Sequence, residues 1–296
     1  MATLREIKGR INSIKNTEKI TRAMKMVAAV KFRKAQENVV AARPYARKLG
    51  EILRSLIPAI DTLDNELLKD REVKRICLVV VTSDRGFAGP FNTNLIREAS
   101  KIIKEKYNEF YTSHNLTLIT VGKKSFDFFS KHEYDIFAKY VGVFDRLEFV
   151  SAQKIIADIL EGYKTKEFDK VVIIYNEFKS AAQAHITEEQ FLPIHSIENS
   201  AQQETEKVSD FIAEPDVKSI IDYMLPKHLN TQIWRIMLES YASEQAARML
   251  AMDSATNNAN ELIKDLQLHY NKARQAAITK ELLEIVSGAE ALKESS

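Results

Sequence analysis

The residues best suited to chemistry in this chain are Thr82–Asn92, which read TSDRGFAGPFN. They follow an apolar run, ICLVVV, and precede a segment of helical composition. A buried strand, a glycine turn and a helix in this order hold a phosphate group in many α/β enzymes, because the turn amides and the helix N-terminus attract anions. The first hypothesis is therefore a nucleotide site.

The spacing of the glycines argues against that hypothesis. A dinucleotide site needs three glycines in the pattern GxGxxG, and a P-loop needs a Lys followed by Ser or Thr after its last glycine. This turn has only Gly86 and Gly89, with the bulky Phe87 between them, and Pro90 has no amide hydrogen to donate. Asp84 also places a carboxylate where an anion would have to bind.

The alternative is a structural turn. In that interpretation Asp84 caps the turn, Gly86 adopts a positive φ, and Asn92 or Thr93 caps the helix that follows. Arg85 is the one residue of the turn that would attract an anion, and a protein carboxylate suits it better than a phosphate.

Other catalytic patterns are missing from the sequence. The six histidines are scattered without metal-ligand spacing, and neither HExxH nor GxSxG occurs. The single Cys77 lies inside the apolar run, which predicts a buried, inert thiol. Glu188 and Glu189 have no apolar setting that would separate their pKa values. We therefore predict a chain that is not itself an enzyme, with no catalytic residue, no cofactor and no metal site.

Long helices are predicted at both ends of the chain. Neither Gly nor Pro occurs between Gly9 and Pro44, and apolar residues recur there at steps of three and four. This pattern predicts a helix that kinks at Pro44 and ends near Pro58. The segment between Pro226 and Gly288 is equally free of Gly and Pro. No compact domain can bury such helices along their whole length, so we expect them to pair as an antiparallel coiled coil.

The predicted surface between the two helices is rich in small side chains, unlike a leucine zipper. Its residues are Met24, Ala28 and Ala29 in the first helix, and Ala246, Ala247, Leu250, Ala251, Ser254, Ala255 and Asn258 in the second. Small side chains bury little area per turn, so the pair is expected to depend on surrounding protein for part of its stability.

The middle of the chain alternates strand and helix patterns. Predicted strands are RICLVVVTS, LTLITVG, DIFAKYV and DKVVIIYNEF, with AHITEEQFLPI as an edge strand, and predicted helices are FNTNLIREASKIIKEKY, KKSFDFFSKHE and SAQKIIADILEGYK. This order predicts a Rossmann-like α/β domain with a largely parallel sheet. The expected fold class is α/β with a long antiparallel coiled coil of the N- and C-terminal helices, and the expected domains are residues 1–58, 74–200 and 208–296.

The net charge of +2 is distributed unevenly. Residues 1–50 contain thirteen Lys and Arg against three Glu, which suits a nucleic acid, an anionic lipid or an acidic protein partner, or else a solvated helix face without a partner. Only Phe32 and Tyr45 are aromatic there, so stacking on bases is poorly supported. A nucleotide-binding enzyme and a nucleic-acid-binding protein stay as rival hypotheses, tested by nucleotide binding to residues 74–200 and by salt-dependent binding to DNA or RNA.

The two ends of the chain resemble one family. Ser243–Leu292, which begins SEQAARMLAMDSATNNANELIKDLQLHYNKARQAAIT and continues ELLEIVSGAEAL after one Lys, resembles the terminal helix of the gamma subunits of F-type ATP synthases. Ile7–Gln36, IKGRINSIKNTEKITRAMKMVAAVKFRKAQ, resembles the opening helix of that family. The turn reads SDRGFAGPFN where the family has SDRGLCGGLN, so the match there is in register but partial.

The resemblance implies a rotor. The terminal helices would form a central shaft inside a ring of three alpha and three beta subunits, and the α/β body would stand on the membrane c-ring beside the epsilon subunit. Ion flow would turn the shaft and drive each beta subunit through successive conformations, which couples ion transport to ATP synthesis or hydrolysis. Membrane association would be indirect. The sequence begins with no signal or transit peptide, which favours a bacterial subunit at the cytoplasmic face of the inner membrane.

The resemblance also implies site residues by position. Those expected to contact a beta subunit are Met24, Arg274, Gln275 and Thr279, the basic residues Lys25, Arg33 and Lys34, which suit an acidic region of beta, and Arg85 in the turn. The foot that would meet the c-ring and the epsilon subunit lies around Glu214–Leu229, with Glu214, Asp216 and Tyr223 as its candidates.

Overall fold

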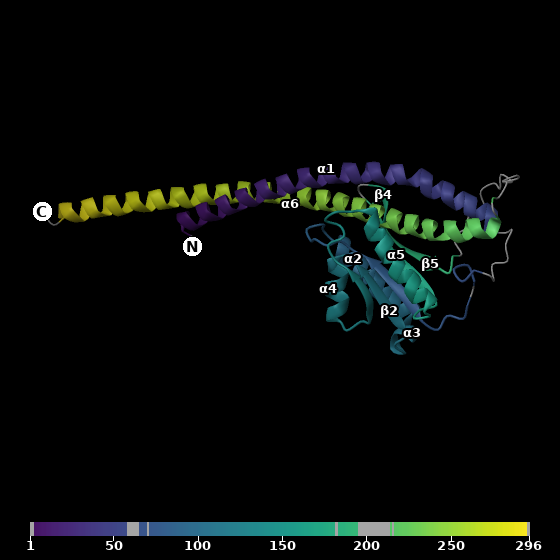
Figure 1. Cartoon of the computed structure of the whole chain (residues 1–296). Helices are drawn as coiled ribbons and strands as arrows, with labels where there is room; N and C mark the ends of the chain where they lie inside the picture. The colour runs from purple at the N-terminus through teal and green to yellow at the C-terminus, as the bar shows by residue number, and fades with distance from the viewer. Residues whose placement is uncertain are drawn as a thin grey trace. The chain divides into compact units, whose positions relative to one another are not determined.

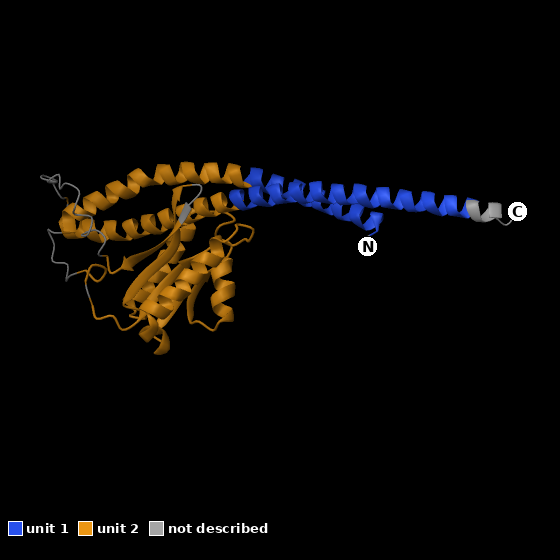
Figure 2. Cartoon of the chain, turned by 180° about the vertical axis from the view of Figure 1, so that it is seen from behind, with its two compact units in different colours: residues 1–27, 249–296 blue, residues 28–248 orange. Residues whose placement is uncertain are grey.

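The computed structural model describes residues 3–57, 65–69, 71–180, 183–194, 214 and 216–294 (Figure 1). By internal contacts the chain divides into two compact units, coloured in Figure 2. Unit 1 comprises residues 1–27 and 249–296, and unit 2 comprises residues 28–248. Each of the two long helices contributes residues to both units.

The two long helices are α1, Leu4–Leu56, and α6, Val217–Glu294. At 1.5 Å per residue they are about 80 and about 117 Å long. Helix α1 begins with a capping box, because the Thr3 amide donates to Glu6 Oε2 at 3.0 Å and the Glu6 amide to Thr3 Oγ1 at 3.3 Å. It continues through Pro44, as predicted, and ends at Leu56. The expected end near Pro58 lies outside the described residues.

Within unit 1 the two helices run antiparallel. The Thr21 hydroxyl lies 2.8 Å from the hydroxyl of Thr256, and Lys25 Nζ lies 2.6 Å from Asp253 Oδ1, so rising numbers in α1 meet falling numbers in α6. The predicted antiparallel pairing is confirmed here. After Ala277, the part of α6 whose side chains are described is exposed on every side.

The predicted contact surface is wrong in detail along this part of α6. Leu250, Ser254 and Asn258 are exposed, and the buried positions are Met252, Thr256 and Ala259. The stretch is rich in Ala, Ser and Asn, so its apolar pattern does not define one helix face sharply. Hydrophobicity therefore does not decide which face of α6 meets α1, and the hydrogen bond between Thr256 and Thr21 helps to fix that face.

Unit 2 contains a five-stranded sheet of order β3-β2-β1-β4-β5. The first four strands are parallel, as expected of a largely parallel sheet. Strand β5 lies at one edge, as predicted, and pairs antiparallel with β4. The strands are β1 Ile76–Val81, β2 Leu116–Val121, β3 Ile136–Tyr140, β4 Lys170–Ser180 and β5 Gln183–Leu192. The shorter helices are α2 Phe91–Lys106, α3 Asn108–Thr112, α4 Lys123–Lys131 and α5 Phe149–Lys164.

Strand β1 is buried on both faces, because alternate side chains enter two separate cores. Its even-numbered residues, beginning with Ile76, pack with Leu95 of α2 and Phe129 of α4. Its odd-numbered residues, beginning with the fully buried Cys77, pack with Ile155 of α5 and with α6 from Ile221 to Met237. Helix α6 is thus one of the layers that cover the sheet, and burial raises the pKa of the Cys77 thiol.

Helices α1 and α6 also pair antiparallel within unit 2. Ala35 and Val39 of α1 form a small apolar cluster with Leu238 and Ala242 of α6. None of these four residues was predicted for the contact surface. Of the predicted small residues in unit 2, Ala28 and Ala246 are almost completely buried, and Ala29 and Ala247 are half-buried.

Candidate functional site

The turn after β1 lies where doubly wound proteins bind ligands. The chain passes from β1 to β2 and β3 on one side and then returns to β4 on the other, so β1 and β4 flank the topological switch point. Here the edge is closed by helix α6, whose Tyr241, Glu244 and Arg248 line a cavity of about 30 Å³ together with Asp84 and Arg85. That volume admits a water molecule or two rather than a nucleotide.

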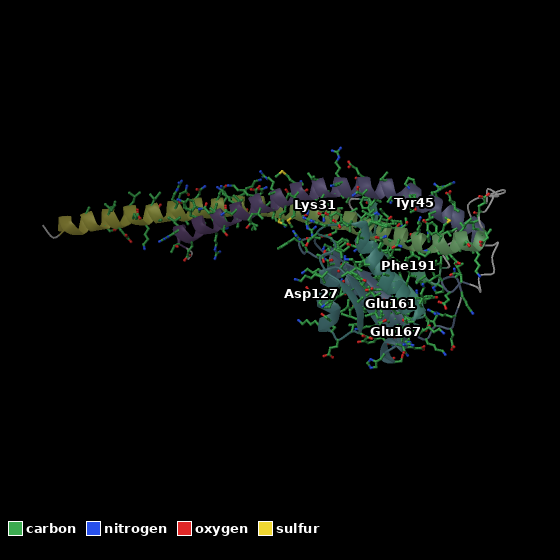
Figure 3. All side chains as sticks on the ribbon, viewed as in Figure 1. Lys31, Tyr45, Asp127, Glu161, Glu167 and Phe191 are labelled. Carbon is green, nitrogen blue, oxygen red and sulfur yellow. The ribbon has the colours of Figure 1, made fainter. Side chains whose placement is uncertain are left out.

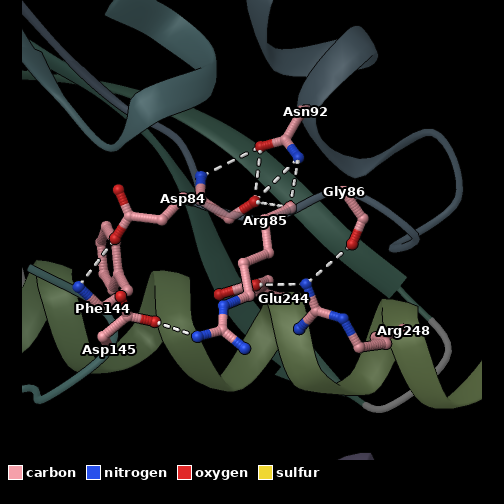
Figure 4. Close-up of polar contacts among 9 residues, drawn as sticks. Asp84, Arg85, Gly86, Asn92, Phe144, Asp145, Glu244 and Arg248 are labelled. Atoms are coloured by element: carbon pink, nitrogen blue, oxygen red, sulfur yellow. Dashed lines mark hydrogen bonds and ion pairs between the residues drawn. The ribbon is translucent and has the colours of Figure 1, made fainter. Parts of the chain in front are cut away.

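The Asp84 carboxylate accepts hydrogen bonds from backbone amides that would otherwise be available to a bound anion. Its Oδ1 accepts hydrogen bonds from the amides of Lys123, at 2.9 Å, and Gly142, at 2.8 Å. Its Oδ2 accepts one from the amide of Phe144, at 3.0 Å (Figure 4). Lys123 is the first residue of α4, so one donor comes from a helix N-terminus. Asp84 is thus an internal anion that joins two neighbouring loops to the turn.

Hydrogen bonds between Ser83 and Asn92 join the beginning of the turn to its end. The Ser83 amide donates to Asn92 Oδ1 at 3.0 Å, Asn92 Nδ2 donates to Ser83 Oγ at 2.8 Å, and Ser83 Oγ donates to the Arg85 carbonyl at 2.7 Å. The prediction that Asn92 or Thr93 caps the next helix is wrong. Helix α2 begins at Phe91 with no side-chain cap, because the Asn92 side chain is turned back toward Ser83.

The backbone of the turn also differs from the prediction for Gly86. Positive φ angles occur at Phe87, 62°, and Gly89, 55°, and Gly86 is not among the residues with positive φ. The Gly86 carbonyl instead accepts a hydrogen bond from α6. Phe87 is 75% exposed, so the turn presents an aromatic side chain to solvent at its tip.

Two arginines contact the turn in different ways. Arg85 Nη2 lies 2.7 Å from Asp145 Oδ1, and both side chains are more than half exposed. Arg248 Nη2 donates to the Gly86 carbonyl at 3.0 Å and lies 2.6 Å from Glu244 Oε1 (Figure 4). The Arg248 and Glu244 side chains are only 11% and 5% exposed. Burial raises the pKa of Glu244, and Arg248 opposes that rise.

Sequence reasoning missed Arg248 and Glu244. The signal was present in SEQAAR, which places a Glu and an Arg one helical turn apart beside small residues of the predicted contact surface. An i,i+4 pair of this kind usually lies on a solvated face, so the pattern alone did not indicate burial.

A second buried polar cluster joins α6 to the sheet. Arg235 Nη2 lies 3.1 Å from Glu189 Oε2. Arg235 Nη1 lies 3.3 Å from the Tyr175 hydroxyl and 3.6 Å from Glu239 Oε1. Burial raises the pKa of Glu239, while Arg235 and Arg43 lower it. These residues were not predicted either.

The other predicted site residues lie on the two long helices. Arg274, Gln275 and Thr279 are exposed on α6, with the Thr279 hydroxyl donating to the Gln275 carbonyl at 2.9 Å. Met24 and Lys25 are half-buried on α1. These five residues belong to unit 1.

The remaining predicted residues belong to unit 2. Arg33 and Lys34 are exposed on α1, and Arg33 Nε lies 3.3 Å from Glu37 Oε1. Asp216 caps α6 by accepting the Ser219 amide at 2.8 Å, which helps to lower the pKa of its carboxyl. Glu214 and Tyr223 are exposed, and Lys227 Nζ lies 2.6 Å from the Tyr223 hydroxyl.

Among the described residues, no cluster of three or more His, Cys, Asp or Glu side chains could hold a metal ion. No helix in the same part of the chain is both long and apolar enough to cross a membrane.

Comparison with known proteins first defines the class. The family model described as "ATP synthase" matches residues 3–292. The chain is 53% identical over 294 residues to the "ATP synthase gamma chain" of Pelodictyon phaeoclathratiforme, covering 99% of each chain, and 48% identical over 304 residues to that of Chloroherpeton thalassium, covering 100% of each. The chain belongs to the ATP synthase gamma chain family. It is therefore a gamma subunit of an ATP synthase.

Solved structures support the fold. A chain of the Euglena gracilis mitochondrial ATP synthase, in a structure titled OSCP/F1/c-ring, rotational state 3, has a TM-score of 0.68 at 22% identity, covering 98% of this chain and 94% of that one. A chain of the Tetrahymena thermophila mitochondrial ATP synthase, in a structure titled central stalk/cring, has a TM-score of 0.59 at 24% identity, covering 80% and 99%. The paired terminal helices with an α/β body are thus a known architecture.

Proposed function

We propose that this chain is the rotating shaft that couples ion flow through a membrane c-ring to the conformational cycle of the catalytic beta subunits. In this role the chain performs no bond chemistry. Whichever face of the shaft meets a beta subunit favours one conformation of that subunit, so rotation shifts the three catalytic sites through their states in turn. ATP synthesis and hydrolysis are the two directions of the same coupling.

The observation that carries this proposal is the exposed end of α6. Ile278, Leu282, Leu283, Ile285 and Val286 are each 49% to 68% exposed, and Figure 3 shows side chains projecting outward along this end of the helix. Large apolar side chains in such number are unfavourable in water and mark a surface that another protein covers. A ring of alpha and beta subunits around the helix would bury them from several directions at once.

The specific contacts follow from position. Arg274 and Gln275 would hydrogen-bond a loop of beta, with Thr279 one turn further along. Exposed basic residues of α1, Arg33 and Lys34, would face an acidic region of beta, together with Lys25 and the neighbouring Met24. Arg85 would add a contact from the turn.

The foot would comprise Glu214, Asp216 and Tyr223, at the start of α6. It would contact the c-ring and the epsilon subunit. In a bacterium this arrangement places the chain at the cytoplasmic face of the inner membrane, held there through the c-ring.

Co-purification from membranes tests the proposal. A tagged chain is expected to recover alpha, beta and epsilon subunits and the c-ring in fixed proportion, and recovery without alpha and beta would refute the shaft. Leu282→Ser with Ile285→Ser is expected to lower recovery of alpha and beta. Lys280→Ser with Glu284→Ser changes an exposed ion pair on the same turns, at 3.6 Å, and should leave recovery unchanged.

A further inference from the structure

We propose that Arg248 and Glu244 of α6 form a latch that holds the Ser83–Phe91 turn against this helix, and that the latch transmits torque between α6 and the α/β body. The inference rests on the proposed shaft function and deepens it. The edge of the sheet at which doubly wound proteins bind ligands would here have a mechanical role, because it holds the chain's own helix α6.

The contact combines a buried ion pair with a hydrogen bond to the turn. One guanidinium nitrogen of Arg248 serves both the Gly86 carbonyl, at 3.0 Å, and the Glu244 carboxylate, at 2.6 Å. A buried ion pair stabilises only when its geometry is good and its remaining hydrogen-bonding groups have partners. The Glu244 carboxylate fixes the position of the Arg248 guanidinium, and that guanidinium donates to the Gly86 carbonyl in the turn. The two side chains therefore act together.

The turn that the latch holds is a fixed point of the body. Asp84 ties it to the amides of Lys123, Gly142 and Phe144, and Asn92 ties it to Ser83. A force applied at Gly86 therefore passes into the loops that follow β2 and β3, rather than being absorbed by bending of one free loop.

The position of the latch along α6 gives it leverage. The apolar packing of α6 against the sheet core extends from Ile221 to Met237, and Arg248 lies eleven residues further on, about 16 Å along the helix. Between them, Tyr241 stacks on Phe144 with ring planes 5° apart. A helix fixed at one place can twist or bend about it, and a second attachment at a distance resists both motions. Arg248 is also the last residue of unit 2.

The exposed pair Arg85–Asp145 does not provide the same attachment. Its side chains are 73% and 54% exposed, and ion pairs in water contribute little because solvent screens them. The buried position of Arg248 makes its hydrogen bond to Gly86 the stronger link.

The test uses the complete ATP synthase complex in inverted membrane vesicles. Arg248→Met keeps an unbranched stem of similar length and removes the donor. Combining it with Glu244→Gln leaves no buried unpaired charge, so this second variant protects against loss of folding. Glu244→Gln alone removes the ion pair and keeps the donor to Gly86. The matched control is Arg47→Met, which breaks an exposed i,i+4 Arg–Glu pair of α1 at 2.9 Å.

Two readouts separate coupling from structure. In the complex, amide hydrogen exchange at residues 85–89 is expected to become about 10- to 100-fold faster in both Arg248→Met variants, the range for a lost hydrogen bond to a charged group. The membrane potential generated per ATP hydrolysed is expected to fall while hydrolysis continues. Glu244→Gln should show smaller changes of the same kind, and Arg47→Met should show neither change.

The outcomes are distinct. Unchanged exchange in both Arg248→Met variants would overturn the latch, and faster exchange with unchanged potential per ATP would overturn its role in torque. If the unmodified complex generated no potential on ATP hydrolysis, the proposed shaft function itself would fail.

Discussion

The Asp84 carboxylate lies 2.9 Å from the backbone nitrogen of Lys123, the first residue of α4. It lies equally close to the amides of Gly142 and Phe144. An aspartate here occupies a group of converging N–H donors that resembles an anion-binding site in other α/β proteins. The chain thus carries a carboxylate of its own where a nucleotide-binding relative of this fold would present amides to phosphate.

Removing this carboxylate should create an anion site. Asp84→Ala is expected to lower the free energy of unfolding by about 1–3 kcal/mol, because three donors lose a charged acceptor. Added formate should restore part of that loss, as measured by urea unfolding. Asp84→Asn is the control, because its amide still fills the space and formate should not rescue it. Equal stabilisation of the unmodified chain and Asp84→Ala by formate would contradict the prediction.

His228 should make the α6 packing sensitive to acid. Burial, aided by the positive charge of Arg235, lowers the pKa of His228 from 6.5 to about 4. Between those values the unfolded chain binds the proton more readily than the folded chain, so stability is present above pH 6.5 and is lost as the pH falls toward 4. The total effect is about 3 kcal/mol, since one pKa unit corresponds to about 1.4 kcal/mol.

The measurement is urea unfolding between pH 4 and 7, followed by the fluorescence of the single Trp234, which also lies on α6. His228→Gln should flatten the dependence over this interval, because the substituted side chain does not titrate. A slope that His228→Gln leaves unchanged would assign the dependence to other groups.

Arg235 should be more important for stability than its position on a long helix suggests. It contacts Glu189, Glu239 and the Tyr175 hydroxyl, and Glu239 is only 4% exposed. Arg235→Met is expected to cost about 3–5 kcal/mol, because it leaves a buried carboxylate without its main partner.

The comparison with a double variant makes this prediction specific. Arg235→Met combined with Glu239→Gln should recover part of the lost stability in urea unfolding, because the buried negative charge is gone. If the double variant is no more stable than Arg235→Met, the loss comes from packing rather than from charge.

The long helices and the sheet could be predicted because their signals are repetitive. Dozens of residues without Gly or Pro, and near-continuous apolar runs such as Ile76–Val81, leave few alternatives. The argument against a phosphate site rested on residue chemistry, namely Phe87 and Pro90.

The details of the site could not be predicted because they depend on contacts distant in sequence. Asn92 has the composition of a helix cap, yet its side chain bonds back to Ser83. Asp84 binds amides 39 to 60 residues away. Arg248 reaches Gly86 across 162 residues, and no local pattern indicates such a partner.

The last prediction concerns the exposed polar pair on α6. Arg274→Ala with Gln275→Ala is expected to lower ATP turnover coupled to ion transport, because both side chains are exposed and available to hydrogen-bond a beta loop. Circular dichroism should be unchanged, since neither side chain is buried. The control is Lys280→Ala, an exposed cation further along α6 and on a different side of the helix from both Arg274 and Gln275. Turnover that is equal in the double variant and the control would count against a role for Arg274 and Gln275, and a parallel loss of helicity would assign the effect to folding.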